Sequence, residues 1–332
     1  MNPALGMVDI VGVGLNATDT LIELPSYPSL GSKVEFSATL VLPGGQVASA
    51  IMAVASWGLR TRYIGKLGDD PAAELHRTEF ARVGVEAHLI RVQKCASQSS
   101  YIFVDRKSGE RTILWQRNAQ LALQPQDLQR EWIVNARLLH VDGHDGYAAA
   151  AAARWAREAG IPVTADFDNL YHGAEQLLAV TDYAIVSREF PARMTGEGDL
   201  LKSLPMMQRR FGCRVAGATL GQDGALVWDG RQFWYAPAYR VNTVDTTGAG
   251  DLFHAAFAFG LLKGWALDLL IDFSCAAAGL NCTALGARGG IRPIEEIEAL
   301  MKNGEQYDRA VDEETLIAAS RAARALQTSS SS

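Results

Sequence analysis

Residues 244–264 read VDTTGAGDLFHAAFAFGLLKG, and this stretch guides the interpretation of the whole chain. From residue 252 onward it has the apolar composition of a buried helix, and it ends at Gly264, a residue type that commonly terminates helices. Residues 248–250, Gly-Ala-Gly, therefore stand at the expected helix N-terminus. Free backbone N–H groups and the helix dipole favour an anion there, and small residues let it approach the main chain. The stretch predicts an anion-binding site.

Asp251 directly follows this anion site. A lone aspartate near a helix start is often only a cap. A cap does not explain the two neighbouring glycines. Phosphoryl transfer explains both features, because it needs donors for the charge on the transferred group and a base for the attacking hydroxyl. We therefore interpret Asp251 as a candidate catalytic base.

Strands and helices alternate along the rest of the chain, a pattern typical of a mostly parallel sheet covered by helices. Buried apolar runs are followed by segments of helical spacing that finish at glycine. The expected strands are 7–15, 60–68, 136–143, 161–168, 183–187 and 214–221, and the expected helices are 45–58, 71–84, 146–160 and 252–264. This order predicts an α/β fold with one large central sheet.

Two segments, residues 17–43 and 97–118, alternate polar and apolar residues instead. The second turns at RKSGER (106–111) in the manner of a hairpin, so we expect antiparallel strands that form a lid apart from the main sheet. One face of such strands needs cover, which predicts a homodimer formed through the lids. We expect a single domain over residues 1–325 and a disordered tail over 326–332.

The composition is that of an ordinary globular protein. Hydrophobic residues make up 48% of the 332 residues, charged residues 20%, and the net charge is −6. No basic patch predicts a nucleic-acid partner, and no apolar run has the length of a membrane span. The start of the chain lacks the pattern of a signal peptide, which predicts a cytoplasmic location. The four cysteines have no metal-site or disulfide spacing and are expected to be small buried side chains.

Three quoted stretches carry a resemblance to one family. DTTGAGDLFHAAFAFGL (245–261) resembles the C-terminal signature of the ribokinase, or PfkB, family of carbohydrate kinases. PGGQVASAIMAVASWGLRTRYIGKLGDD (43–70) resembles the N-terminal signature, and GATLGQDGALVWDG (217–230) resembles the nucleotide-side strand and turn. The similarity runs from Val8 to about Glu298 and is closest to the ketohexokinase and sulfofructose kinase branches. It implies a ribokinase-like fold and an ATP- and Mg²⁺-dependent kinase that phosphorylates a hydroxymethyl group of a small sugar.

The resemblance also implies roles for individual residues. The catalytic set would be Asp251 as the base, with the amides of Gly248, Ala249 and Gly250 as the anion hole. Sugar contacts would come from Asp19, Gly44, Gly45, Ser49 and Asp245. Nucleotide contacts would come from Thr219, Gly221, Gly224, Ala278, Asn281, Cys282 and Gly286. In several family members the loop at the position of Asp245 helps to hold a monovalent cation such as K⁺, and this option stays open here.

Some positions depart from the family pattern. Ser49 stands where the family usually has an asparagine, and the metal-associated Asn-x-x-Glu is replaced by SREF (187–190), so metal ligands are left unassigned. Asp142 and Asp145 follow an expected strand, and we place them at the carboxyl edge of the sheet, where sites of open α/β proteins lie. His254 is interpreted as a packed helix residue.

The substrate is less sharply indicated than the reaction. We favour a neutral ketohexose or pentose. The alternatives are a nucleoside and an acidic sugar of the sulfofructose or ketodeoxygluconate type, for which Lys33, Arg111 and Arg117 could supply the positive charge. A non-catalytic sugar sensor would not need the glycines together with Asp251. In a dinucleotide-dependent oxidoreductase, GVGLNAT (12–18) would be the dinucleotide-binding loop, but that stretch lacks the third glycine of such loops.

Overall fold

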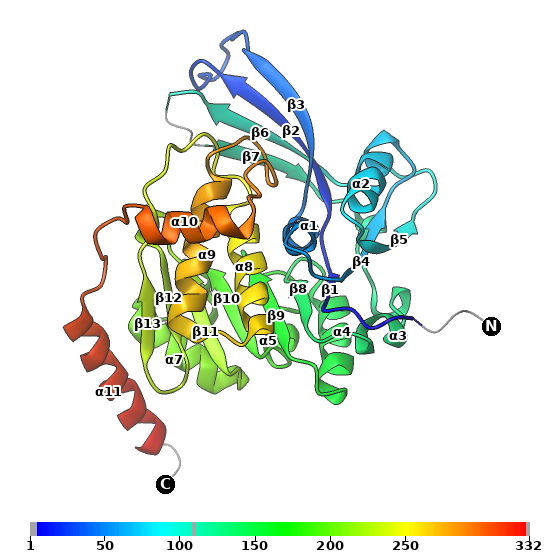
Figure 1. Ribbon diagram of the computed structural model, residues 1–332. Coiled ribbons are helices and arrows are strands. Elements are labelled where there is room, and N and C mark those ends of the chain that lie inside the picture. The colour runs from blue at the N-terminus through cyan, green and yellow to red at the C-terminus, as the bar shows by residue number, and fades with distance from the viewer. Residues whose placement is uncertain (1–4, 108–110, 330–332) are drawn as a thin grey trace.

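A nine-stranded sheet forms the centre of the computed structural model, which describes residues 5–107 and 111–329 (Figure 1). The strand order is β13-β12-β11-β10-β9-β8-β1-β4-β5, and all neighbours are parallel except at β12 and β13. The strands are β1 (Ile10–Val13), β4 (Thr61–Leu67), β5 (Glu86–Arg91), β8 (Leu139–Asp142), β9 (Val163–Phe167), β10 (Tyr183–Ser187), β11 (Val215–Thr219), β12 (Ala225–Trp228) and β13 (Phe233–Ala236). The predicted α/β fold with a mostly parallel sheet is confirmed.

Helices cover both faces of this sheet (Figure 1). They are α1 (Gln46–Ser56), α2 (Pro71–Arg82), α3 (Arg130–Val134), α4 (Gly146–Glu158), α5 (Ala174–Leu178), α6 (Phe190–Thr195), α7 (Leu200–Phe211), α8 (Ala249–Lys263), α9 (Leu267–Asn281), α10 (Ile294–Asn303) and α11 (Glu313–Ser329). Successive strand residues enter opposite cores: Ala184 and Val186 pack with α4, α5 and α7, whereas Ile185 packs with α1, α8 and α9. A strand that is buried on both faces must be apolar at every position, which explains the unbroken apolar runs in the sequence.

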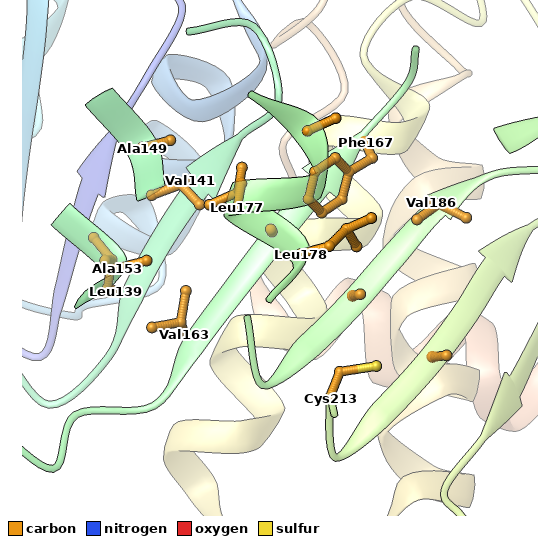
Figure 2. Close-up of a cluster of buried hydrophobic side chains, with 14 of the residues drawn as sticks. Leu139, Val141, Ala149, Ala153, Val163, Phe167, Leu177, Leu178, Val186 and Cys213 are labelled. Carbon is orange, nitrogen blue, oxygen red and sulfur yellow. The ribbon is translucent and has the colours of Figure 1, made fainter. Parts of the chain in front are cut away.

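The core between the sheet and α4 shows why the alanine run forms that helix. Ala149 and Ala153 lie against Leu139, Val141 and Val163 of the strands beneath (Figure 2). Small side chains on this face let the helix lie close to the sheet, and alanine also has the highest helix propensity. Cys213 is buried in the same cluster, as expected. Cys95 and Cys275 are also buried, and Cys282 is half-buried.

A second sheet of four strands stands apart from the main sheet (Figure 1). It contains, in the order β3-β2-β6-β7, the strands β3 (Ala38–Gly44), β2 (Ala17–Leu24), β6 (Ser99–Asp105) and β7 (Arg111–Gln116). The outer pairs are antiparallel as expected, but β2 and β6 are parallel. The expectation of a purely antiparallel lid is therefore wrong. The physical reason is that β2 and β6 each leave the main sheet after one of its parallel strands, β1 and β5, and so set out in the same direction.

Parts of the predicted lid turn and of the predicted C-terminal tail lie outside the described residues. Of the expected turn at 106–111, residues 108–110 lie outside the described part of the chain, as do residues 330–332 of the expected tail. Helix α11 continues to Ser329, so the backbone is helical for four residues beyond the expected start of the tail at 326. Among the described residues, no helix has both the length and the apolar character needed to cross a bilayer.

Candidate active site

A cavity of about 570 Å³ lies between the lid and the carboxyl ends of the parallel strands, and we call it the first cavity. Its wall combines lid strands, the loops that follow β8 and β9, and the beginning of α8. The lining residues include Asp19, Gly45, Gln46, Ser100, Trp115, His144, Asp166, Asp168, Tyr171, Gly250 and Asp251. This is the edge at which sites of open α/β sheets lie.

A second cavity of about 370 Å³ adjoins the first, because Arg111, Thr219 and Gly250 line both. Its wall is formed by the turn after β11, the start of α8 and the exposed side of α9. The residues expected on the nucleotide side that line it are Thr219, Gly221, Gly224, Ala278 and Cys282. The two cavities thus meet at the N-terminus of α8.

Helix α8 begins three residues earlier than expected, at Ala249. The two glycines at its start, Gly248 and Gly250, differ in whether a side chain would fit. Gly248 is the N-cap with φ of 76°, and a Cβ there would lie 2.3 Å from the Ala287 carbonyl oxygen. A side chain at this position would be strained and would clash. A Cβ at Gly250, in contrast, would have no atom within 4 Å, because the residue faces the open junction of the two cavities. The first turn of α8 at Gly250 therefore faces open space that suits an anion, whereas the Ala249 amide already donates to the Thr246 carbonyl at 3.3 Å.

Asp251 lies in the first turn of α8 and lines the first cavity, where it is half-buried. Burial raises the pKa of its carboxyl well above the ordinary value, and the negative charges of Asp166 and Asp19 raise it further. The positive charge of Arg288 and a hydrogen bond from Ser49 oppose this increase. A carboxyl with a raised pKa is a stronger base once ionised, as general-base catalysis requires.

Asp19 reaches the same cavity from the lid. Its Oδ1 accepts a 2.6 Å hydrogen bond from the Ser100 hydroxyl, and burial raises its pKa to about 6. A Cβ on Gly44 would lie 2.0 Å from Oδ2 of Asp19, so the carboxylate occupies the space that a side chain there would need. Gly45 lines the cavity with φ of 94°. The structure thus brings Asp19, Gly45 and Asp251 to one cavity although they are far apart in sequence.

Ser49 and Arg288 form the support beneath this cavity. Ser49 is fully buried on α1 and does not line the cavity, and its direct contact with a sugar stays a prediction. Its hydroxyl instead accepts a 3.2 Å hydrogen bond from Nε of Arg288, whose Nη2 donates to the Gly44 carbonyl at 2.8 Å. Sequence reasoning missed Arg288, because no local pattern indicates a contact across 239 positions of the chain.

Asp245 has a structural role in the loops around α8. It is fully buried and lines neither cavity. Its Oδ1 accepts from the amide and the hydroxyl of Thr247 at 2.9 and 2.7 Å, and its Oδ2 accepts from the Gly286 amide at 2.8 Å. Asp245 thus connects the loop before α8 to the loop after α9, and its contact with the substrate stays a prediction.

Asn281 and Gly286 belong to the same loop support rather than to the second cavity. The Asn281 amide donates to the Thr247 carbonyl at 2.9 Å and to the Ala287 carbonyl at 3.3 Å. Gly286 has φ of 83°, and a Cβ there would lie 2.5 Å from Cδ1 of Leu42. Neither residue lines the second cavity, and their nucleotide contacts stay a prediction. Both hold the backbone around α8 in place.

Asp166 is a further residue that sequence reasoning missed. It lies next to the end of β9 and lines the first cavity, where its Oδ1 lies 3.2 Å from Nε2 of His254 and its Oδ2 accepts from the Gln46 amide at 3.1 Å. His254 is buried as expected, but it also makes this contact with Asp166. The rule that placed Asp142 at the carboxyl edge applies equally to Asp166, so the signal was present in the sequence.

The cations and acids around the first cavity are largely paired already. Asp142 accepts from the amides of Leu15 and His144, and Asp145 pairs with Arg117. Arg111 hydrogen bonds with the Thr246 hydroxyl at the junction of the cavities. Lys33 is exposed and lines neither cavity.

No group of three or more His, Cys, Asp or Glu side chains among the described residues could hold a metal ion by itself. Glu189, in the stretch that replaces the metal-associated motif, is exposed before α6 and lines neither cavity. Mg²⁺ in phosphoryl-transfer sites is typically bound by one or two carboxylates together with substrate phosphates. Asp166 is the cavity carboxylate whose charge acts most strongly on Asp251, and it fits such a partial ligand.

Comparisons with known proteins identify sugar kinases as relatives of this chain. The ATP-dependent ribose-1-phosphate kinase of Halopiger xanaduensis is 27% identical over 286 residues, which cover 85% of this chain and 94% of that protein. The fructokinase of Klebsiella pneumoniae is 30% identical over 273 residues, covering 75% and 88%. The solved ribokinase of Thermotoga maritima shares the fold with a TM-score of 0.79 at 24% identity, covering 89% of this chain and 100% of that one.

The family itself is matched over most of the chain. Residues 16–294 match the pfkB family carbohydrate kinase. This range contains Asp19, Asp251 and the glycines that line the two cavities. The resemblance to the ribokinase, or PfkB, family is confirmed, and the closer likeness to the ketohexokinase and sulfofructose kinase branches stays a prediction. This chain belongs to the pfkB family of carbohydrate kinases.

Proposed function

We propose that this protein is an ATP-dependent kinase that phosphorylates a hydroxymethyl group of a small neutral sugar, a ketohexose or a pentose. One observation carries the proposal: Asp251 and the first turn of α8 stand where the two cavities meet. The second cavity would hold the nucleotide and the first the acceptor. A phosphoryl group that passes from one to the other must cross this junction.

The residues at the junction fit in-line transfer. Asp251 accepts the proton of the attacking hydroxyl, and the amides at the start of α8 stabilise the negative charge on the transferred group. Arg111, fixed by the Thr246 hydroxyl and lining both cavities, adds positive charge at the same point. Mg²⁺ supplies charge neutralisation on the ATP phosphates when bound, with Asp166 as its protein carboxylate. A monovalent cation such as K⁺ at the loop that contains Asp245 stays a prediction.

The charges of the first cavity favour a neutral acceptor over an acidic one. Four carboxylates line it, from Asp19, Asp166, Asp168 and Asp251, whereas Arg117 is paired with Asp145 and Arg111 stands at the phosphate junction. An acidic sugar would meet like charges in a confined space, which is costly. Among the relatives, the name of the fructokinase states a neutral sugar and that of the ribose-1-phosphate kinase an anionic one. The cavity fits the former.

Release of ADP in the presence of a sugar panel tests the function directly. We expect turnover with fructose or ribose and little with ketodeoxygluconate or sulfofructose. A sugar sensor would bind without releasing ADP, and an oxidoreductase would consume a nicotinamide instead. Faster turnover of the acidic sugars than of every neutral one would contradict the assignment of a neutral acceptor.

The two glycines of α8 are predicted to respond differently to alanine. Gly250→Ala should fold normally but lose roughly 10- to 10³-fold in kcat, because the new methyl group projects into the transfer junction and removing one oxyanion contact has that order of effect. Gly248→Ala should lower the melting temperature, because its φ is positive and its Cβ would clash with Ala287. Thermal melts and steady-state kinetics separate the two. Full activity of Gly250→Ala would argue against the anion hole.

The pH profile of kcat/KM should show the raised pKa of Asp251. Since the base works only when ionised, activity should fall as the pH decreases, with an acid limb well above the ordinary pKa of an aspartate. Asp166→Asn removes a neighbouring negative charge and should move this limb to lower pH, because ionisation of Asp251 becomes easier. A limb that stays in place in Asp166→Asn would show that Asp251 is not the titrating group.

The outer face of the lid supports the proposal of a homodimer. Val41, Tyr101 and Leu114 are 59%, 53% and 53% exposed, and they lie in one row across the strands, with Thr20 between Val41 and Tyr101. An exposed row of this kind on a sheet is typically covered by a partner. We propose that two lids pack face to face about a twofold axis.

Light scattering at micromolar concentration checks the dimer. The unchanged chain should have the mass of two copies, and Tyr101→Lys should shift it toward one copy, because a charge would be buried in the apolar contact. Arg91→Lys, exposed at the end of β5 and away from the lid, serves as the control. A monomeric mass for the unchanged chain would exclude the dimer.

A further inference from the structure

We propose that Arg288 and Ser49 are positioning residues of the transfer reaction: Arg288 fixes the Ser49 hydroxyl, and this hydroxyl orients the carboxylate of Asp251. The inference rests on the proposed function and adds to it two residues that stand behind the base. Neither side chain lines the first or the second cavity, so any effect of theirs on the reaction must pass through a residue that does.

The hydrogen bonds of Ser49 have a fixed direction. A guanidinium can only donate, so the Ser49 oxygen is the acceptor of the 3.2 Å hydrogen bond from Nε of Arg288. The single O–H group of the serine is then free to donate, and it donates to the carboxylate of Asp251. A carboxylate held in this way has fewer orientations, which helps a base to meet one particular hydroxyl of the acceptor.

The hydroxyl of Ser49 is used differently from that of Ser56 on the same helix. Ser56 donates back to the Met52 carbonyl of α1 at 2.9 Å, an arrangement that is common for serine within a helix. Ser49 is fully buried, and its hydroxyl instead joins the loop after α9 to the first turn of α8. Its hydrogen bonds therefore connect separate elements of the site.

The guanidinium of Arg288 makes its two hydrogen bonds in different directions. Nε donates to Ser49, and Nη2 donates to the Gly44 carbonyl at the end of β3 at 2.8 Å. Gly44 lies against the carboxylate of Asp19, because a Cβ on Gly44 would be 2.0 Å from Oδ2 of that aspartate. A lysine carries all its donors on one atom and could not replace this fork.

The loop that carries Arg288 is fastened on both sides of it. The Gly286 amide donates to Asp245 at 2.8 Å, and the Gly290 amide donates to Asn281 at 3.1 Å. The side chains of Asp245 and Asn281 are themselves fully buried. A guanidinium on a loop held at two points can fix the position of a neighbouring hydroxyl.

The charge of Arg288 is maintained at an energetic cost. Burial lowers the pKa of its guanidinium to about 10, and its Nη1 is buried without a hydrogen-bond partner among the described residues. The negative charges of Asp251 and Asp19 oppose this decrease, and the side chain is protonated near pH 7. An arginine that only fastened a loop would be expected to have its buried donors paired. Its charge acts instead on the proposed base and on the lid aspartate.

Substitution of Ser49 separates positioning from direct contact with the sugar. Ser49→Ala should lower kcat by roughly 10- to 150-fold, because hydrogen bonds to charged groups have that order of effect. The KM for the sugar and the KM for ATP should hardly change. Ser56→Ala on the same helix is the matched control and should leave all three constants as they are. A raised sugar KM at normal kcat would show that Ser49 contacts the sugar, and the inference would be overturned.

Combination with the base variant is the sharpest measurement. If Ser49 acts through Asp251, then Ser49→Ala introduced into the Asp251→Asn chain should lower kcat by less than about twofold, because residues that act as a unit are not additive. The same loss in both backgrounds would show that Ser49 only supports the fold, and it would contradict the positioning role.

Arg288→Lys tests the other end of the hydrogen bond to Ser49. It should lower kcat by a similar factor, and the double variant Ser49→Ala/Arg288→Lys should be no slower than the slower single variant. Arg292→Lys, in the same loop but lining neither cavity, is the control and should leave kcat unchanged. Multiplied losses in the double variant would show that the two residues act independently. If thermal melts show that Arg288→Lys does not fold, the Ser49 measurements decide.

These outcomes are distinct from failure of the proposed function. ADP release by the unchanged chain, its loss in Asp251→Asn and a normal kcat in Ser49→Ala would keep the kinase function and remove only the inference. No ADP release with any acceptor would remove the kinase function, and the positioning role would be removed with it.

Discussion

Asp251→Asn is expected to lower kcat by roughly 10²- to 10⁴-fold, which is the usual contribution of a general base to the rate. Asparagine has nearly the same shape as aspartate, so the fold and much of the affinity for ATP should remain. The loss should fall on the chemical step, because only the proton acceptor has been removed. Steady-state kinetics with a saturating neutral sugar, together with ATP binding by calorimetry, measure both parts of this expectation.

Asp268→Asn is the matched control. Asp268 also stands in the first turn of a helix, α9, but it is exposed and lines neither cavity. Its substitution should leave kcat unchanged. Near-normal turnover of Asp251→Asn would remove Asp251 from the mechanism, whatever the control shows.

Asp19→Ala is expected to raise the KM for the sugar by roughly 5- to 150-fold while changing the KM for ATP little. The reason is that sugar hydroxyls lose their acceptor in a confined cavity, which costs on the order of 1 to 3 kcal/mol. Asp19 lines only the first cavity of the two described, so the nucleotide side should not respond. Varying each substrate in turn separates the two constants.

Ser100→Ala provides the graded comparison. Ser100 donates its hydroxyl to Oδ1 of Asp19, so its loss should weaken sugar binding less than loss of the carboxylate itself. If Asp19→Ala raises both Michaelis constants together, or leaves the sugar constant unmoved, the lid aspartate does not hold the acceptor.

Local patterns in the sequence predicted most strands of the main sheet and the presence of helix α8. β10 was placed at its observed bounds, because its unbroken apolar run carries its own signal. The glycines at 248 and 250 and Asp251 were found for the same reason, since an anion site at a helix start is a local feature. The start of α8 itself was placed three residues late, because Gly-Ala-Gly looks like a loop in the sequence.

Contacts between distant segments could not be predicted in this way. Arg288 bonds Ser49 and Gly44 across more than two hundred residues, and nothing near Arg288 in the sequence indicates this. Asp245 looked like a cavity residue because of its neighbours, but its carboxylate is directed into the loop that contains Gly286. Strand pairing is equally non-local, which is why the parallel contact between β2 and β6 was missed.

The continuous pairing of β3, β2, β6 and β7 makes the lid a plate of fixed dimensions. Backbone hydrogen bonds between strands hold the side chains of Asp19 and Ser100 in one row of this plate. A plate paired in this way is expected to respond as a unit, so a substitution that breaks the pairing of β2 with β6 should displace Asp19 from the first cavity even when the substituted residue lies far from that cavity.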